Sequence, residues 1–301
     1  MNSAIAIAIV LVQRWMPSEQ IPAHSALTEI NKKDVQKVFD TLAPVYDNPA
    51  TRFFPFTADR LVRFVKPRPG TRVLDVATGT GAVAIPFAQA VGPGGGRVTA
   101  IDLSSGMLDR AEANISKMAL ANVDLHEMDA ERLDFRADYF HYLVCSYGLF
   151  FLPDMSAALR EWVRVLRPGG KLAFTCFEET AFEPMLDDFV GRLQAFGVQL
   201  PEGPFGSRRI TSLDHCRELL SEAGLVDIDA ECIQVGYHLG DENDWWEVVS
   251  NTAMRALFDQ VPDDRKAEFR QQHLAFVATQ KNANGLWMDV QSRFASGIKP
   301  G

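Results

Sequence analysis

The sequence lacks the features that mark disulfide-rich, metal-binding and nucleic-acid-binding proteins. Its four cysteines are widely spaced and form no C-x-x-C pair: Cys145, Cys176, Cys216 and Cys232. This spacing argues against a disulfide framework or a zinc site, so we predict no metal. The 30 Lys and Arg residues are outnumbered by 39 Asp and Glu, for a net charge of -9. Nucleic-acid binding needs a basic surface, so we predict no nucleic-acid partner.

Long apolar runs are also missing. The most apolar segment near the start, Ala4–Val12, is far shorter than the roughly 20 residues of a membrane-spanning helix. It resembles the hydrophobic part of a signal peptide, but no Lys or Arg precedes it. We expect residues 1–30 to be an N-terminal extension, with Met16 as an alternative start and a packed arm as an alternative role. A cytoplasmic protein without a stable membrane span fits this pattern.

The chain is organised around residues 71–102. An apolar run that ends at Val76 predicts a buried strand, and Gly79 and Gly81 follow it as a turn. A helical pattern comes next, and then a second apolar run that ends on Asp102. Asp102 lies 23 positions after Gly79, close to the spacing of about 20 that is typical of a ribose-binding acid. The segment therefore predicts half of a nucleotide-binding sheet, with a site for a cofactor.

The rest of the chain alternates between strand and helix patterns. This alternation predicts an α/β fold with a seven-stranded, mostly parallel, doubly wound sheet. We expect residues 226–238 and 285–296 to form its last two strands, with a helical lid inserted between them. The expected units are the extension 1–30, a cofactor-binding core with N-terminal helices at 31–177, and the remaining sheet with the substrate lid at 178–301.

Five motifs in order resemble those of the class I S-adenosylmethionine-dependent methyltransferases. Residues 73–81 match the hydrophobic-Leu-Asp-x-Gly/Ala-x-Gly-x-Gly motif of that family, and residues 98–102, 128–131, 140–151 and 165–170 match its later motifs. Residues 38–47 also resemble the N-terminal motif of the ubiquinone/menaquinone-biosynthesis C-methyltransferases and their small-molecule relatives. The matches cover about residues 35–176. The resemblance implies a Rossmann-like fold and S-adenosylmethionine as the cofactor.

The same resemblance implies a set of cofactor-binding residues. Asp75 would hold the amino-acid end, Asp102 the ribose hydroxyls, and Asp129 the adenine amino group. The full set is Tyr46, Asp75, Ala77, Gly79, Gly81, Asp102, Leu103, Met107, Asp129, Ala130, Ser146 and Tyr147. Structural explanations stay open for several of them: a turn for Asp75 and Asp129, a helix cap for Asp102, and packing for Tyr46 and Met107.

Catalytic and acceptor residues are harder to infer. Many relatives carry histidine after strand four, where this chain has Phe150 and Phe151. No general base is identified. Tyr147 and His238 are candidates, and a solvated surface histidine is the alternative for His238. We expect Phe150, Phe151, Phe205, Trp245 and Trp246 to bind substrate, although the tryptophans could serve lid packing alone.

The resulting hypothesis is an enzyme that transfers the sulfonium methyl group by in-line displacement to a small, lipophilic or neutral metabolite. It would act as a monomer or homodimer. A non-methylating cyclase or interaction module on the same fold is the alternative. A nicotinamide-dependent oxidoreductase is disfavoured, because Asp75 and the later motifs do not belong to that pattern.

Overall fold

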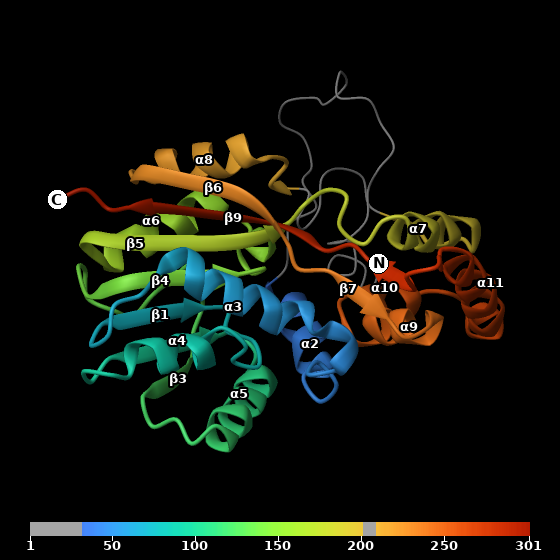
Figure 1. Cartoon of the computed structure of the whole chain (residues 1–301), viewed down its shortest axis with the longest axis horizontal. Coiled ribbons are helices and arrows are strands. Elements are labelled where there is room, and N and C mark those ends of the chain that lie inside the picture. The colour runs from blue at the N-terminus through green and yellow to red at the C-terminus, as the bar shows by residue number, and fades with distance from the viewer. Residues whose placement is uncertain (1–31, 201–208) are drawn as a thin grey trace.

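A seven-stranded sheet forms the centre of the protein. The computed structural model describes residues 32–200 and 209–301 (Figure 1). The strand order is β3-β2-β1-β4-β5-β9-β6. The strands are β1 (Arg72–Val76), β2 (Arg97–Asp102), β3 (Val123–Glu127), β4 (Phe140–Ser146), β5 (Leu166–Phe177), β6 (Val226–Gln234) and β9 (Gln291–Ile298). The first five run parallel, and β9 is antiparallel to both β5 and β6. The predicted mostly parallel sheet is confirmed.

Helices cover both faces of the sheet, because successive strand residues point to opposite sides and both sides are apolar. Val73 packs with α3 (Phe53–Val65) and α4 (Ala84–Val91) on one face. Its neighbour Leu74 packs in the core of the other face, with α6 (Met155–Val165) and α8 (Leu213–Glu222). Helix α5 (Ser105–Lys117) contacts β2 and β3, and α2 (Lys32–Leu42) lies against α5. The buried β1 at the centre therefore has helices on both sides, which is the doubly wound arrangement.

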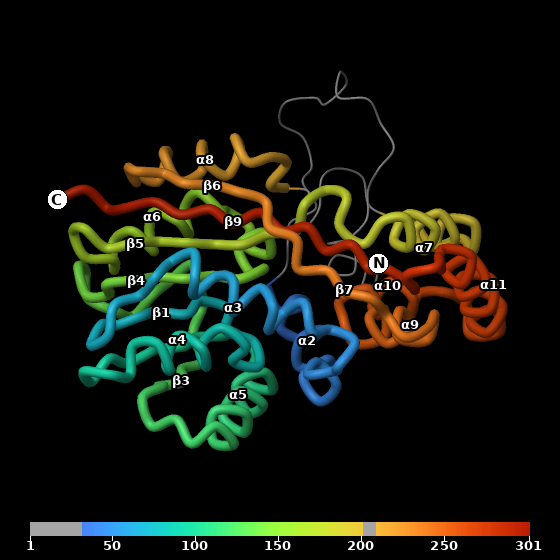
Figure 2. The backbone as a smooth tube through the Cα atoms, viewed as in Figure 1, coloured from blue at the N-terminus to red at the C-terminus, as the bar shows by residue number. Residues whose placement is uncertain are grey.

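A helical subdomain lies at one end of the sheet. The chain leaves β6, passes through the helices α9 (Glu242–Asn251), α10 (Met254–Phe258) and α11 (Lys266–Thr279), and returns along β9 (Figure 2). Helix α7 (Met185–Ala195) packs against α11. In Figure 1 these four helices gather beside α2 at the right of the sheet. An insertion of helices between the last two strands was predicted; the contribution of α7 was not.

The two strand predictions at the edges of this insertion were wrong in extent. Residues 226–238 form β6 and a separate short strand, β7 (Tyr237–Leu239), which pairs with β8 (Leu286–Met288) in its own two-stranded sheet. The break falls at Gly236, where a Cβ would clash with the carbonyl oxygen of Met288. The alternation of apolar and polar residues continues through this break. The sequence therefore predicts one strand where the tertiary structure has two.

Membrane-spanning helices are not found in the part of the chain that the structure describes: none of its helices is both long and apolar enough to cross a bilayer. The predicted extension 1–30 lies outside the described residues.

Candidate active site

A cavity of about 510 Å³ opens where the parallel strands end. Residues at the end of each of the first five strands, or directly after it, line the cavity: Ala77–Thr80 at β1, Asp102–Leu103 at β2, Met128–Ala130 at β3, Ser146–Gly148 at β4 and Phe177 at β5. Ligands of open α/β sheets bind at these carboxyl ends. The cavity therefore lies where a nucleotide-type cofactor is expected.

The glycine turn forms one wall of this cavity. Gly79 has a φ of 55°, and a Cβ placed there would meet no atom of the described residues within 4 Å. The turn thus leaves free space that a bound molecule can occupy. Gly81, at φ 86°, does not line the cavity; a Cβ placed there would lie 3.5 Å from the Cβ of Ala111 on α5, which is an ordinary van der Waals distance. The positive φ therefore explains the glycine at this position better than a lack of space does.

Asp102 is held in place by backbone donors. Its Oδ2 accepts a 2.8 Å hydrogen bond from the Gly79 N–H, and its Oδ1 accepts one of 2.9 Å from the Ser104 N–H. Burial raises the pKa of Asp102, while these N–H groups act in the opposite direction. Ser104 caps α5 by accepting a hydrogen bond from the Met107 N–H. Asp102 is therefore not the capping residue of this helix, and it lines the cavity. A fixed carboxylate in this place suits a pair of ribose hydroxyls.

Asp75 stands behind the wall of the cavity. Its Oδ2 accepts a 2.6 Å hydrogen bond from the Thr78 hydroxyl, but its Oδ1 is buried without a partner among the described residues. Burial raises the pKa of Asp75 to about 7. A buried carboxyl oxygen without a donor is costly unless a ligand satisfies it. Asp75 does not itself line the cavity, and the backbone of Ala84 also acts to lower its pKa. A carboxyl in this place fits the cationic amino-acid end of S-adenosylmethionine from behind the turn that carries Gly79.

The predicted adenine contacts Leu103, Met107, Asp129 and Ala130 all line the cavity. Lys32 of α2, which the sequence analysis missed, also lines it and donates a 2.7 Å hydrogen bond to Asp129 Oδ2. It forms a second ion pair with Glu131. Asp129 therefore has an ionic partner in this structure before any ligand is considered.

Two further acids attach the N-terminal segment to the loops that follow β1 and β2. Asp40 accepts a hydrogen bond from the Ser104 hydroxyl, and Asp47 accepts one of 2.6 Å from the Thr80 hydroxyl. Asp47 also accepts one of 2.8 Å from Asn114. Tyr46, next to Asp47, lines the cavity and stacks on Phe54 with ring centroids 5.0 Å apart. Both acids lie in the N-terminal motif, and that motif is the signal that could have identified them.

Tyr147 lines the cavity, but its hydroxyl is hydrogen-bonded to two other residues. The hydroxyl forms 2.7 Å hydrogen bonds with Thr57 and Ser292, both buried side chains. Burial raises the pKa of the Tyr147 phenol, with these two hydrogen bonds acting in the opposite direction. The ring stacks on Phe177 at a centroid distance of 4.1 Å. The suggestion that Tyr147 orients the nucleophile is therefore not supported. The neighbouring Ser146 also lines the cavity, and its hydroxyl is hydrogen-bonded to that of Thr175.

The structure does not support His238 as a general base either. His238 lies exposed on β7, with its ring 5.0 Å from that of Trp287, and it does not line the cavity. The expectation that a strand-end histidine faces the site failed because the strand in question ends earlier, at Gln234.

Many of the remaining residues that line the cavity are aromatic. Phe150 and Phe151, which were predicted to bind substrate, are among the residues that line the cavity. Further residues that line the cavity were not predicted: Phe53 and Phe54 of α3, Phe177 at the end of β5, Phe182 before α7, and Thr252 and Met254 of the lid. These residues come from four separated segments, and no local pattern joins them.

The two lid tryptophans do not bind in the cavity. Trp245 and Trp246 are buried inside the lid, and neither lines the cavity. Their prediction as substrate contacts is therefore wrong in this structure, and the lid-packing alternative holds. Phe205 lies outside the described residues.

The sheet order, the glycine turn and the acids Asp75 and Asp102 together define a class I S-adenosylmethionine-dependent methyltransferase. The ubiE/COQ5 methyltransferase family matches residues 27–195, more than half of the sequence, and the chain belongs to this family. Its cofactor is S-adenosylmethionine, as predicted.

Named relatives support this assignment. The aklanonic acid methyltransferase DauC of Streptomyces sp. (strain C5) is 37% identical over 174 residues, which is 57% of this chain and 79% of that protein. The nocamycin O-methyltransferase of Saccharothrix syringae is 38% identical over 138 residues, 46% of this chain and 49% of that protein. A demethylmenaquinone methyltransferase of Listeria monocytogenes is 36% identical, across 49% of this chain and 63% of that protein. For the last two, the match spans less than two thirds of the relative.

Solved structures confirm the fold. The YcgJ protein of Bacillus subtilis matches with a TM-score of 0.54 and 22% identity, over 81% of this chain and 98% of that chain. The cyclase SpnF matches with a TM-score of 0.56 and 18% identity, over 89% and 96%. At this identity the likeness concerns the fold alone. The named relatives are methyltransferases, so the cyclase and oxidoreductase alternatives are not favoured.

Proposed function

We propose that this methyltransferase acts on a small, lipophilic metabolite that carries an aromatic or similarly flat ring system. The observation that carries the proposal is the aromatic wall of the cavity beyond the cofactor site. Phe53, Phe177 and Phe182 are in edge-to-face contact with one another, with ring centroids 5.1 to 5.9 Å apart. Flat apolar surfaces pack well in such rings, and burial of apolar area supplies most of the binding free energy.

Cofactor binding is assigned to the residues around the glycine turn. Asp102 would accept the ribose hydroxyls, Asp75 would face the ammonium group, and Leu103 and Met107 would contact adenine. The cofactor supplies an electrophilic methyl group on a sulfonium. The protein then contributes chiefly by placing the acceptor in line with the S–CH₃ bond, and the thioether that leaves needs no acid.

The acceptor side offers no evident general base among the described residues. The acids that line the cavity are already committed: Asp47 to Thr80 and Asn114, Asp102 to backbone N–H groups, and Asp129 to Lys32. The phenol of Tyr46 has a pKa raised by burial and by the charge of Asp102, so it holds its proton. We infer that the acceptor presents a nucleophile that ionises readily by itself, such as an acidic hydroxyl or a carboxyl group.

The names of the relatives agree with such an acceptor. One is named for aklanonic acid and one is named an O-methyltransferase. The third is named for demethylmenaquinone. These names concern those proteins; for this chain they support a search among aromatic acids, acidic phenols and quinols.

A labelling screen tests the proposal. The enzyme is incubated with methyl-labelled S-adenosylmethionine and a panel of aromatic acids, acidic phenols, quinols and aliphatic amines, and products are identified by mass spectrometry. We expect label in an acidic or quinol acceptor and none in the amines. The Asp102→Ala variant is the control, because it removes the ribose contact and leaves the aromatic wall unchanged. Labelling of the amines alone would contradict the proposal, and absence of any cofactor binding would contradict the cofactor assignment.

We also propose that residues 178–301 supply the acceptor lid. We further propose that the enzyme works in the cytoplasm, as a monomer or homodimer, and that it has no nucleic-acid partner. Three of its four cysteines are buried free thiols, which fits a reducing compartment, and its net charge is -9. Light scattering after gel filtration measures the oligomeric state, and cell fractionation the location.

A further inference from the structure

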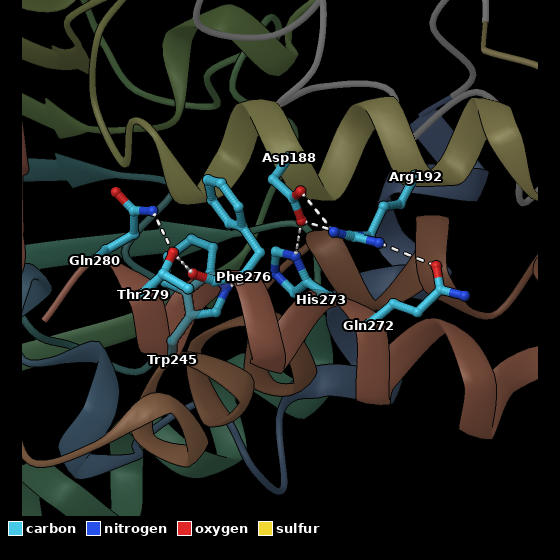
Figure 3. A network of polar contacts seen from close by, with 8 residues as sticks. All are labelled: Asp188, Arg192, Trp245, Gln272, His273, Phe276, Thr279 and Gln280. Carbon is cyan, nitrogen blue, oxygen red and sulfur yellow. Dashed lines mark hydrogen bonds and ion pairs between the residues drawn. The ribbon is translucent and has the colours of Figure 1, made fainter.

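A buried chain of hydrogen bonds joins three helices of the lid (Figure 3). The indole Nε1 of Trp245 on α9 donates a 2.7 Å hydrogen bond to Nε2 of His273 on α11. Nδ1 of the same imidazole is 2.7 Å from Oδ2 of Asp188 on α7. Arg192, one turn further along α7, donates to both oxygens of the Asp188 carboxylate at 2.6 and 2.9 Å. Trp245 and His273 are both 0% exposed.

The chain fixes the protonation state of His273. An indole N–H is only a donor, so Nε2 of His273 must accept with its lone pair. The single proton of the neutral ring is then on Nδ1, and it is donated to the carboxylate of Asp188. Protonation of Nε2 would place two N–H groups against each other, and the bond to Trp245 would be lost. The arrangement therefore requires a neutral imidazole.

The surroundings of His273 favour the neutral form. Burial lowers the pKa of His273 below its ordinary value of 6.5, and the positive charge of Arg192 acts in the same direction, whereas Asp188 opposes them. For Asp188, burial alone would raise the pKa, but the hydrogen bonds from His273 and Arg192 outweigh it and hold the pKa below 3.8. The other groups packed on the imidazole are uncharged rings: Phe189 from α7, Trp246 from α9 and Phe269 from α11. The cation of Arg270 lies over Trp246, 5.4 Å from the ring centroid.

Trp245 connects this chain to the wall of the cavity. Its ring packs on Phe182 with centroids 6.2 Å apart, and Phe182 lines the cavity. Helix α9, which carries Trp245, ends at Asn251, and the residues that follow include Thr252 and Met254 of the cavity wall. Trp245 is therefore connected to both Phe182 and the segment with Thr252 and Met254, and a shift of its ring would be expected to affect them.

We propose that neutral His273 is a positioning residue that holds the lid helices α7, α9 and α11 together and so shapes the acceptor side of the cavity, and that protonation of its imidazole loosens this lid. The proposal rests on the proposed function in one respect, that this side of the cavity receives the acceptor. His273 touches neither cofactor nor acceptor and acts through Trp245.

Hydrogen exchange tests the proposal without any acceptor. Amide exchange is measured by mass spectrometry for lid peptides and for β1 at about pH 7.5 and about pH 5.5, which bracket the ordinary histidine pKa of about 6.5. Each lid rate is divided by the β1 rate to remove the intrinsic pH dependence of exchange. In the native protein we expect opening of α9 and α11, relative to β1, to rise about tenfold at the lower pH, the effect of one lost buried hydrogen bond.

Two variants separate the hydrogen bond from general packing. Trp245→Phe removes the indole donor and keeps an aromatic ring, so the lid should open about tenfold more at the higher pH and respond less to acidification. Trp246→Phe is the matched control on the same helix and should keep the native pH response. Nitrogen-15 spectra of the histidines should show a neutral, Nδ1-protonated ring for His273 that is lost in acid.

The outcomes decide the proposal either way. A lid whose relative exchange is the same at both pH values, an equal effect of the two tryptophan variants, or a charged His273 at the higher pH would overturn it. Calorimetry with S-adenosylhomocysteine distinguishes this failure from failure of the proposed function. Trp245→Phe should bind S-adenosylhomocysteine as the native protein does, because the cofactor site lies outside the lid. If the native protein itself does not bind S-adenosylhomocysteine, the cofactor assignment is wrong, and the proposal for the lid is not affected.

Discussion

Replacing Asp75 by asparagine should remove a pH-dependent cost to folding. The pKa of this buried carboxyl rises from 3.8 to about 7, so the native protein retains a proton that the unfolded chain has already released. Stability therefore falls as pH rises between these two values and is level above the higher one. At about 1.4 kcal/mol for each pH unit, the difference amounts to at most about 4 kcal/mol at neutral pH and above.

Asparagine carries no charge at any of these pH values, and its amide oxygen can keep the hydrogen bond from Thr78. We expect Asp75→Asn to differ from the native protein by an amount that grows by up to about 1.4 kcal/mol per pH unit from about pH 4 to about pH 7, with the variant becoming the more stable one. Urea unfolding at a series of pH values measures this difference. A difference that does not change with pH would refute the argument that Asp75 is buried as a carboxyl of raised pKa.

The same variant should bind the cofactor poorly. If Asp75 faces the ammonium group, binding favours its ionised form, and a proton is released when S-adenosylhomocysteine binds at a pH of about 6. Calorimetry in buffers of different ionisation enthalpy counts this proton. We expect release in the native protein and none in Asp75→Asn. Equal proton release from both proteins would show that another group responds to the ligand.

Three further variants test the remaining parts of the site. Asp102→Asn should lower affinity for S-adenosylhomocysteine about ten- to a hundredfold by calorimetry, the cost of losing hydrogen bonds to a charged group; unchanged affinity would remove Asp102 from the site. Gly79→Val should weaken the same binding at least roughly tenfold, because a branched side chain would enter the open space and would be strained at a φ of 55°; tight binding by this variant would contradict the proposed position of the cofactor. Tyr147→Phe should lower the free energy of unfolding by about 1 to 3 kcal/mol, because it leaves the hydroxyls of Thr57 and Ser292 without this partner, and should leave kcat nearly unchanged; a large fall in kcat at undiminished stability would restore a catalytic role for the hydroxyl.

The cofactor half of the site could be predicted because its residues follow one another closely along the chain. Gly79 and Asp102 stand at the ends of neighbouring parallel strands, and parallel order brings such ends to one edge of the sheet. Their roles toward the cofactor remain predictions, but their place in the cavity does not depend on any long-range detail.

The acceptor half could not be predicted in the same way. Apolar periodicity shows that a residue is buried, and it does not show which buried surface the residue meets. Trp245 and Phe182 are both buried aromatic residues, yet Phe182 lines the cavity and Trp245 packs behind it. Tyr147 was placed correctly beside the cavity, but the direction of its hydroxyl depends on Ser292, which is 145 positions away.

The sequence by itself determined the class of fold, the family and the methyl donor, because these depend on short strand, turn and acid patterns whose geometry is local. Only the tertiary structure decided that Lys32 reaches Asp129, that one apparent strand divides at Gly236, and that Asp188, His273 and Trp245 form one chain across three helices. Each of these depends on contacts between segments that are distant in sequence, and such contacts are set by how the elements pack and not by any pattern within them.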